Sequence, residues 1–407
     1  MRSHVPMTLG DTLEDNALRF GDQPAYIMGD QRISHRQLLG RGKQLAAALE
    51  GLGLQRQDRI GILAMNSLEY GEVLAAGQWS GLIVATVNFR LAPPEMAHII
   101  NDSAPRVLLF EAQYLEVIEQ LRPQLPSVET YICIGGESAW AREYNAFLEQ
   151  GSAEGSSYRA REEDVACLIY TSGTTGKPKG CILGQREMRE GARTMSVETR
   201  SGPADRILLV MPLFHIGAMA MGQGTHFRGG CVVLHREFNP QDLLRAVQED
   251  GVTILHLAPT LVQMVLDCPE VSTTNLSQLH TVVYSAAAMP LPVLQQGIEL
   301  MGNIFTNLYG QTEVFTSGLL REQHRPDGSE REKRWLTSVG QPFPNTLVRI
   351  VDDEGNDCPP GEAGEILVKS AAMARGYWNN SIATLETFRD GWCHSGDVGV
   401  IDEDGML

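Results

Sequence analysis

The first third of the chain alternates between two spacings of apolar residues. Leu38, Leu45 and Leu49 recur on one helical face of a run that opens at Ser34 and is followed by two glycines. This spacing predicts an amphipathic helix that ends at the glycines. Residues 59–64 form a short apolar stretch instead, which is typical of a buried strand.

The same alternation continues over most of the sequence. Further helices are predicted at residues 68–79, 94–100 and 241–248. Further strands are predicted at residues 82–87, 106–110, 165–170, 207–211, 231–234, 254–257 and 281–284. Strands and helices that alternate at this spacing form parallel sheets with crossover helices. We therefore predict an α/β fold with two doubly wound, mainly parallel sheets, in α/β subdomains over residues 1–165 and 166–330.

The pattern changes near residue 335. Short apolar runs are separated there by turn-forming Asp, Asn, Gly and Pro residues, which predicts a small, barrel-like β-rich subdomain over residues 331–407. A charge-dense segment, Arg321 to Lys333, is predicted to be an exposed loop. The sequence stops two residues after a predicted turn at 402–405, and we expect a truncated chain because domains seldom stop within a hairpin.

Composition narrows the class of protein. The 407 residues carry a formal net charge of −17, which argues against nucleic acid or an anionic membrane as the main partner, because phosphate would be repelled. The N-terminus does not have the pattern of a signal peptide, and no apolar stretch is long enough for a membrane span. The seven cysteines form no CxxC pair, which predicts reduced thiols and a cytoplasmic location.

The stretch from Tyr170 to Gly180 reads YTSGTTGKPKG and follows a predicted strand. Its glycines let backbone amides approach an anion, its hydroxyls donate hydrogen bonds, and Lys177 and Lys179 supply positive charge. The sequence therefore predicts a loop that binds a polyphosphate. The alternative for a generic GTTGK string is a surface turn with two solvated lysines.

This loop does not follow the Walker pattern. A Walker loop reads GxxxxGK followed by a Ser or Thr, and a helix begins at once. Here Pro178 follows Lys177, and only two residues separate Gly173 from Gly176. Because proline lacks an N–H and disfavours helix in the residue before it, the Walker interpretation is excluded.

The full eleven-residue string resembles the signature of the adenylate-forming superfamily, which includes acyl-CoA synthetases, peptide-synthetase adenylation domains and firefly-type luciferases. Four later segments match that superfamily in the expected order: PLFHIG at 212–217, SAAAMP at 285–290, YGQTE at 309–313 and WCHSGD at 392–397. The resemblance covers about residue 8 to residue 407. One departure is the segment 184–186, where the family often has Thr-His or Ser-His and this chain has Gly-Gln-Arg.

The resemblance implies that the segment around His215 borders the carboxylate substrate. It also implies that this segment begins a helix that lines the substrate pocket. Amino-acid-activating members usually carry an Asp beside the position of Phe214, which binds the substrate ammonium. His215 cannot form that ion pair, and this favours fatty or aryl acids. Taken alone, a histidine at this position is more often a packed or capping residue.

The three remaining segments are implied to surround the nucleotide. The ring of Tyr309 would stack on adenine, the Thr312 hydroxyl would bond the α-phosphate, Glu313 would bind Mg²⁺, and Asp397 would accept hydrogen bonds from the ribose. The small residues from 285 to 288 would run beside the adenine and the acyl group. Taken alone, these segments could be a strand-to-helix turn, a solvated acid and a hairpin turn.

The resemblance thus implies overlapping sets of site residues. The catalytic set is Thr171, Lys179, His215, Thr312 and Glu313, and the metal ligands are Glu313 and Thr171. The nucleotide set is Thr171, Ser172, Gly173, Thr174, Thr175, Gly176, Lys177, Ser285, Ala286, Ala287, Tyr309, Gly310, Gln311, Thr312 and Asp397. The substrate set is His215, Gly217, Met219, Ala258, Ala287, Ala288 and Gly310.

The implied activity is that of an AMP-forming acid–thiol ligase. ATP and Mg²⁺ would activate a fatty or aryl carboxylic acid to an acyl-adenylate, and CoA would then accept the acyl group. The family's C-terminal lid domain is absent from this sequence, so weak activity is expected. Two alternatives stay open: a carrier-protein-loading adenylation domain of peptide-synthetase type, and a non-catalytic nucleotide-binding homologue. The oligomeric state is also open, and a homodimer is one possibility.

Overall fold

The computed structural model describes residues 8–171 and 176–407. The chain divides into two compact units. Unit 1 consists of Met1–Arg189, Pro212–Met219 and Ala374–Thr384, and unit 2 consists of Glu190–Met211, Ala220–Met373 and Leu385–Leu407.

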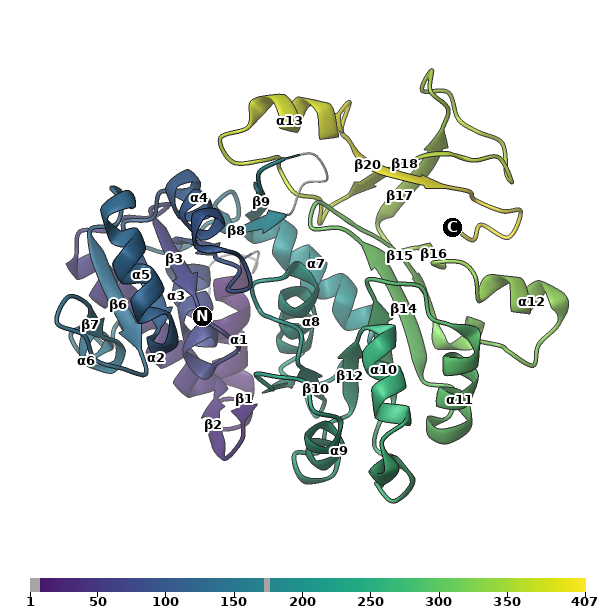
Figure 1. Ribbon diagram of the computed structural model, residues 1–407, viewed down its shortest axis with the longest axis horizontal. Helices are drawn as coiled ribbons and strands as arrows, with labels where there is room; N and C mark the ends of the chain where they lie inside the picture. The colour runs from purple at the N-terminus through teal and green to yellow at the C-terminus, as the bar shows by residue number, and fades with distance from the viewer. Residues whose placement is uncertain (1–7, 172–175) are drawn as a thin grey trace. The chain divides into compact units, whose positions relative to one another are not determined.

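Unit 1 contains a seven-stranded sheet with the order β7-β6-β5-β3-β4-β8-β9 (Figure 1). Its strands are β3 (Arg59–Leu63), β4 (Ile83–Thr86), β5 (Val107–Glu111), β6 (Thr130–Ile134), β7 (Arg142–Glu143), β8 (Val165–Thr171) and β9 (Lys179–Gly184). Neighbouring strands from β7 to β8 are parallel, and β9 runs antiparallel to β8. Strands β4 and β5 are buried throughout, as expected for a sheet that is covered on both faces.

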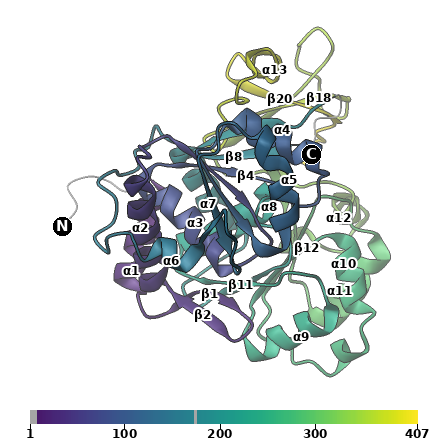
Figure 2. The ribbon, with the colours of Figure 1, turned by 60° about the vertical axis from the view of Figure 1, so that its left-hand side comes forward.

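Helices cover the two faces of this sheet (Figure 2). One group consists of α1 (Leu9–Arg19), α2 (His35–Gly51), α3 (Leu68–Ser80) and α6 (Tyr144–Leu148), and the other of α4 (Pro93–Ser103) and α5 (Leu115–Leu121). Helix α2 begins where the sequence predicts because Ser34 and Gln37 form a capping box. The hairpin of β1 (Pro24–Met28) and β2 (Gln31–Ser34) precedes α2, and the 3₁₀ helices η1 (Ala112–Tyr114) and η2 (Arg122–Gln124) flank α5.

Unit 2 contains the second mainly parallel sheet, in which the strands follow the order β16-β15-β14-β13-β12-β10-β11. The parallel strands are β10 (Arg206–Leu209), β11 (Cys231–Leu234), β12 (Ile254–Leu257), β13 (Thr281–Ser285) and β14 (Phe305–Gly310). Strands β15 (Phe315–Leu319) and β16 (Gln341–Pro342) are antiparallel additions at one edge. The helices of this part of the chain are α7 (Gln185–Glu198), α8 (Ile216–Phe227), α9 (Pro240–Glu249), α10 (Pro259–Leu266) and α11 (Leu291–Met301), with the 3₁₀ helix η3 (Pro269–Ser272) after α10.

The β-rich part is a four-stranded antiparallel sheet with the order β17-β18-β20-β19. It consists of β17 (Thr346–Val351), β18 (Gly364–Ser370), β19 (Phe388–Arg389) and β20 (Trp392–Gly399), and α13 (Ser381–Thr387) precedes β19. Ile350, Ile366, Val368 and Cys393 lie in its apolar core. The predicted fold class, two mainly parallel sheets with helices and a smaller β-rich part, is confirmed.

Two local predictions need correction. The segment Arg321 to Lys333 is not a continuous loop, because it contains η4 (Arg321–Gln323) and the start of α12 (Glu330–Trp335). Helix α12 forms because Ser329 and Glu332 make a capping box, which the density of charge concealed. The apolar run at residues 398–401 is predicted to be a short strand of the β-rich subdomain, but strand β20 spans Trp392–Gly399, so Asp397 lies inside a strand.

The turn at residues 402–405 forms as predicted, with a hydrogen bond of 3.0 Å from the Gly405 N–H to the Asp402 carbonyl. After the turn, the Leu407 N–H donates to the Gly340 carbonyl at 2.8 Å. Within residues 8–171 and 176–407, no helix combines the length and the apolar character that a membrane crossing requires.

Candidate active site

The carboxyl ends of three parallel strands in unit 2 bring predicted site residues together. Ala258 follows β12, Ser285 ends β13, and Tyr309 lies one residue before the end of β14. These positions are neighbours along one edge of the sheet, because Leu257 pairs with Tyr284 and Ser285 pairs with Leu308. In open α/β sheets, ligands bind outside this edge.

Three small residues follow β13 and are exposed: Ala286, Ala287 and Ala288. Ala286 has a φ of +69°, a left-handed conformation that costs a residue with a Cβ about 1 kcal/mol. The Ser285 hydroxyl lies 2.9 Å from Nε2 of His256. The chain therefore turns sharply at the end of this strand and leaves short side chains beside the predicted adenine position.

Tyr309 and Asp397 are far apart in the sequence but in direct contact. The Tyr309 hydroxyl donates to Oδ2 of Asp397 at 2.5 Å, and Nε2 of Gln311 donates to the same oxygen at 3.0 Å. Burial, together with the neighbouring carboxylate, raises the pKa of Tyr309, so its hydroxyl stays protonated at neutral pH. In the part of the chain that the structure describes, no hydrogen bond reaches Oδ1 of Asp397, which leaves that oxygen available to a ligand hydroxyl.

Glu313 lies near β20, the strand of the small sheet that also contains Asp397. Its side chain is buried in the turn between β14 and β15, which a 2.8 Å hydrogen bond from the Gln311 N–H to the Val314 carbonyl closes. Burial raises the pKa of Cys393 in β20 to about 12, and the charges of Glu313 and Glu365 add to the effect. Glu313 is therefore close to β20, the strand that contains Asp397.

Glu313 suits a magnesium ion that arrives with a polyphosphate. Among the described residues, no three His, Cys, Asp or Glu side chains gather as a metal-holding group. Mg²⁺ commonly uses one or two protein carboxylates and takes its other ligands from phosphate and water. The single buried carboxylate of Glu313 fits that pattern, with the predicted second ligand, Thr171, in unit 1.

The predicted phosphate loop joins the last two strands of the unit 1 sheet. Thr171 ends β8 and pairs with Lys179, the first residue of β9. Gly176 and Lys177 are exposed beside this hairpin. Four predicted residues lie outside the described part of the chain: Ser172, Gly173, Thr174 and Thr175.

Lys179 contacts a residue that sequence reasoning did not single out. Its Nζ lies 4.5 Å from the centroid of the Tyr377 ring, a cation–π distance. Tyr377 is 6% exposed and belongs to a segment that runs along β9, where the Trp378 N–H donates to the Gly180 carbonyl at 2.7 Å. The string GYWN at 376–379 is the only sequence feature that could have drawn attention to this segment.

The departure at 184–186 has a structural explanation in unit 1. Gln185 is fully buried, where its Oε1 accepts from the Leu9 N–H at 3.1 Å. Arg375 donates from Nη2 and Nε to one carboxylate oxygen of Glu187, at 2.7 Å and 3.0 Å. A Cβ at Gly184 would collide with both of these charged groups. The segment therefore anchors neighbouring elements of unit 1.

His215 immediately precedes α8 and caps it. Its Nδ1 accepts a hydrogen bond of 3.1 Å from the Gly217 N–H, so the neutral ring carries its proton on Nε2. Phe214 packs edge-to-face on Phe89 at 5.3 Å. This is the capping geometry that the sequence left open, and it leaves Nε2–H free to donate to a carboxylate. Met219, one turn into the helix, is buried.

The remaining substrate residues lie at the sheet edge of unit 2, except Gly217 and Met219, which belong to unit 1. Gly310 is exposed, and a Cβ there would come within 2.9 Å of the Val314 carbonyl oxygen, so no larger residue fits. Thr312 is partly exposed in the same turn as Glu313. The individual roles of these residues stay predictions.

Comparison with known proteins identifies the family. The sequence profile described as AMP-binding enzyme matches residues 13–378. The chain is 30% identical to the fatty acid–[acyl-carrier-protein] ligase ScoC of Streptomyces coeruleorubidus, over 100% of this chain and 78% of that protein. It is 32% identical to a feruloyl-CoA synthase of Amycolatopsis sp, over 93% of this chain and 73% of that protein.

A solved structure agrees with the sequence matches. The anthranilate CoA ligase AuaEII, in complex with anthranoyl-AMP, superposes with a TM-score of 0.88 and 27% identity, over 100% of this chain and 78% of that one. The sequence profile covers most of the chain, and the fold agrees from end to end. The chain therefore belongs to the AMP-binding enzyme family.

Proposed function

We propose that this chain uses ATP to convert a fatty or aryl carboxylic acid into an acyl-adenylate, and that the acyl group then passes to the thiol of CoA. The contact among Tyr309, Gln311 and Asp397 carries this proposal. It sets an aromatic ring beside an oriented carboxylate at the carboxyl edge of a parallel sheet, which suits the adenine and ribose of a nucleotide. The names of the relatives, which concern fatty, ferulic and anthranilic acids, support the choice of acid.

In the first step, a carboxylate oxygen of the acid attacks the α-phosphorus of ATP. The new O–P bond forms as the bond to pyrophosphate breaks, and negative charge develops on the leaving group. We assign its stabilisation to Lys177, Lys179 and the Thr312 hydroxyl, together with the amides of the loop. Mg²⁺ held by Glu313 and Thr171 would neutralise phosphate charge. Nε2–H of His215 would orient the attacking carboxylate.

In the second step, a thiolate sulfur attacks the acyl carbon, and AMP leaves with the bonding electron pair. The phosphate ester is a far better leaving group than the oxide of a free carboxylate. This is the physical reason for spending ATP on the acid first.

Pyrophosphate exchange tests the proposal directly. A panel of fatty, aryl and amino acids would be assayed with the parent chain and with Asp397→Asn and Glu313→Gln. Each substitution removes a charged contact to the nucleotide or metal, so exchange should fall by about tenfold or more. Asp353→Asn, an exposed turn residue of the small sheet, is the matched control. Failure of every acid to support exchange would contradict the proposal.

A carrier protein is the second candidate acceptor, because ScoC is named as a ligase that loads one. Thioester formation on a carrier protein, but not on CoA, would favour that acceptor.

A further inference from the structure

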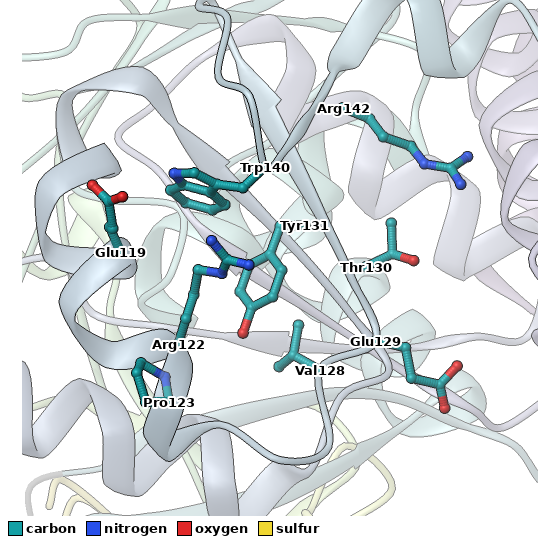
Figure 3. Close-up of a pocket in the computed structure, with 9 residues that line it drawn as sticks. All are labelled: Glu119, Arg122, Pro123, Val128, Glu129, Thr130, Tyr131, Trp140 and Arg142. Carbon is teal, nitrogen blue, oxygen red and sulfur yellow. The ribbon is translucent and has the colours of Figure 1, made fainter.

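A cavity of about 570 Å³ lies at one edge of the unit 1 sheet, bordered by α5, η2, β6 and β7 (Figure 3). The strand order puts this edge at the opposite end of the sheet from β8 and β9, which flank the predicted phosphate loop. The volume falls within the range of small-molecule sites, roughly 300–1,000 Å³. None of the residues assigned to ATP, acid or CoA lines the cavity.

Aromatic rings and one arginine form the wall of the cavity. The Trp140 ring stacks on Phe110 at 5.5 Å and meets Tyr131 edge-on at 5.6 Å. The guanidinium carbon of Arg122 lies 4.5 Å from the centroid of the Trp140 ring and 5.3 Å from that of Tyr131 (Figure 3). A guanidinium stacked in this way is held in place by its faces, while the N–H groups at its edge can still donate.

The charges that line the cavity are not balanced. In the described structure, neither Arg122 nor Arg142 forms an ion pair with a carboxylate. Glu129 is already bound by Arg106, whose Nη2 and Nε donate to its two carboxylate oxygens at 2.7 Å and 3.0 Å. Glu119 is the remaining acid and is exposed. The Arg142 guanidinium points away from Arg122 and the aromatic wall (Figure 3) and lies 5.7 Å from the centroid of the Phe147 ring, so the positive charge at the wall is that of Arg122.

We propose that this cavity binds a small anion that carries a planar ring. Its anionic group would accept paired hydrogen bonds from Arg122, and its ring would lie against the aromatic wall. A nucleoside monophosphate and an aryl carboxylate share this chemistry, and the experiment distinguishes them. The site is separate from the proposed active site and does not depend on the proposed function.

Calorimetric titration of the full chain with AMP and, separately, with 2-naphthoate tests the proposal. The Asp397→Asn background weakens the predicted nucleotide site. We expect at least one probe to bind the Asp397→Asn protein. Adding Arg122→Ala to this protein should weaken the binding of that probe about tenfold, because a charge-assisted pair of hydrogen bonds is lost. Arg122→Lys should fall between the two, because an ammonium cannot make the paired contact. Arg349→Ala is the matched control, since Arg349 also lies over a tryptophan, at 5.4 Å, but is paired with Asp357.

Arg122-dependent binding of AMP identifies a nucleotide as the ligand class, and Arg122-dependent binding of 2-naphthoate identifies an aryl carboxylate. Failure of both probes to bind at millimolar concentration overturns the proposal, and so does equal affinity in Arg122→Ala. Trp140→Phe provides a second measurement that does not rely on Arg122. It should abolish the quenching of tryptophan fluorescence by the bound probe, whereas Trp392→Phe should leave the quenching in place. Thermal melts of all variants check that each is folded.

Discussion

At the residue scale, the hydroxyl of Tyr309 and the carboxylate of Asp397 form the most informative contact in unit 2. Their separation of 2.5 Å is in the range of charge-assisted O–H···O bonds, which are stronger than neutral ones. The bond fixes the carboxylate before any ligand arrives. Ordering of Asp397 is thus completed during folding and does not reduce the affinity for a nucleotide.

We expect Tyr309→Phe to weaken AMP binding about five- to tenfold, because the ring can still stack on adenine but the bond that orients Asp397 is lost. Gln311 would remain as a donor and limit the loss. Calorimetry with AMP measures the effect, and Tyr158→Phe, in unit 1, is the control. Unchanged affinity in Tyr309→Phe would show that the hydroxyl does not position the carboxylate.

A backbone prediction follows from the φ of +69° at Ala286. Glycine adopts this conformation without steric cost, so Ala286→Gly should raise the free energy of unfolding by about 1 kcal/mol. Ala287→Gly, next in the chain, should instead lower it slightly, because that residue does not have a positive φ. Urea unfolding of both variants measures the difference, and a loss of stability in Ala286→Gly would contradict the prediction.

Glu198, buried in α7, makes the stability of the fold depend on pH. Burial raises its pKa from 4.5 to about 7, partly offset by the charge of Arg200. A raised pKa in the folded state favours folding at low pH, and this contribution is lost as the pH rises from about 4.5 to about 7.

Glu198→Gln should therefore stabilise the protein at pH 8, by on the order of 2 kcal/mol, and have little effect near pH 4.5. Urea midpoints across this pH range measure the change. Glu249→Gln, at an exposed position of α9, is the matched control. A stabilisation that does not vary with pH would rule out ionisation of Glu198 as its cause.

At the scale of elements, strand β9 is supported from two directions within unit 1. It pairs with β8 on one side, and on the other the segment Ala374–Thr384 returns from far along the chain. The Ile182 N–H donates to the Gly376 carbonyl at 2.9 Å, which fixes the register between them. This register places the Tyr377 ring next to Lys179 at the end of the predicted phosphate loop.

We expect Tyr377→Leu to raise the KM for ATP about three- to tenfold while kcat changes less, because a cation–π contact of about 1 kcal/mol holds Lys179 in place. Tyr377→Phe keeps the ring face and should restore the KM. Steady-state pyrophosphate release measures both constants. If the Leu and Phe variants behave alike, the ring does not position the lysine.

At the scale of the whole molecule, the net charge of the chain has the same sign as the charge of its predicted ligand. The chain carries 50 acidic and 33 basic residues, yet its predicted ligand is a polyanion. Such a ligand can bind only where cations and amide donors are concentrated locally, as in the stretch from Lys177 to Lys179. Residues of the predicted nucleotide set occur in both compact units.

Saturating ATP with Mg²⁺ should therefore raise the melting temperature, since a ligand at about 100 times its Kd contributes about 2.7 kcal/mol to stability. Removal of Mg²⁺ with EDTA should reduce the shift, because phosphate charge would then be less neutralised. Differential scanning fluorimetry measures both effects. Absence of any shift would contradict the prediction that this chain binds ATP.

Sequence patterns were sufficient to predict the structural features that depend on residues close together in the chain. The cap at Ser34 and the apolar strands are local, and each reports on the backbone within a few positions. Periodicity and turn chemistry act over the same short range, so the two parallel sheets could be predicted. The resemblance then indicated which residues form the candidate site, and the role of each of these residues stays a prediction.

Only the tertiary structure could decide which distant residues meet. The contacts of Tyr377 with Lys179, of Arg375 with Glu187 and of Tyr309 with Asp397 each join segments that are separated by dozens to hundreds of residues. Such pairs arise from strand order and register, which no local spacing encodes. The chain's own sequence thus determined its elements and its candidate chemistry, whereas three-dimensional packing determined which side chains orient that chemistry.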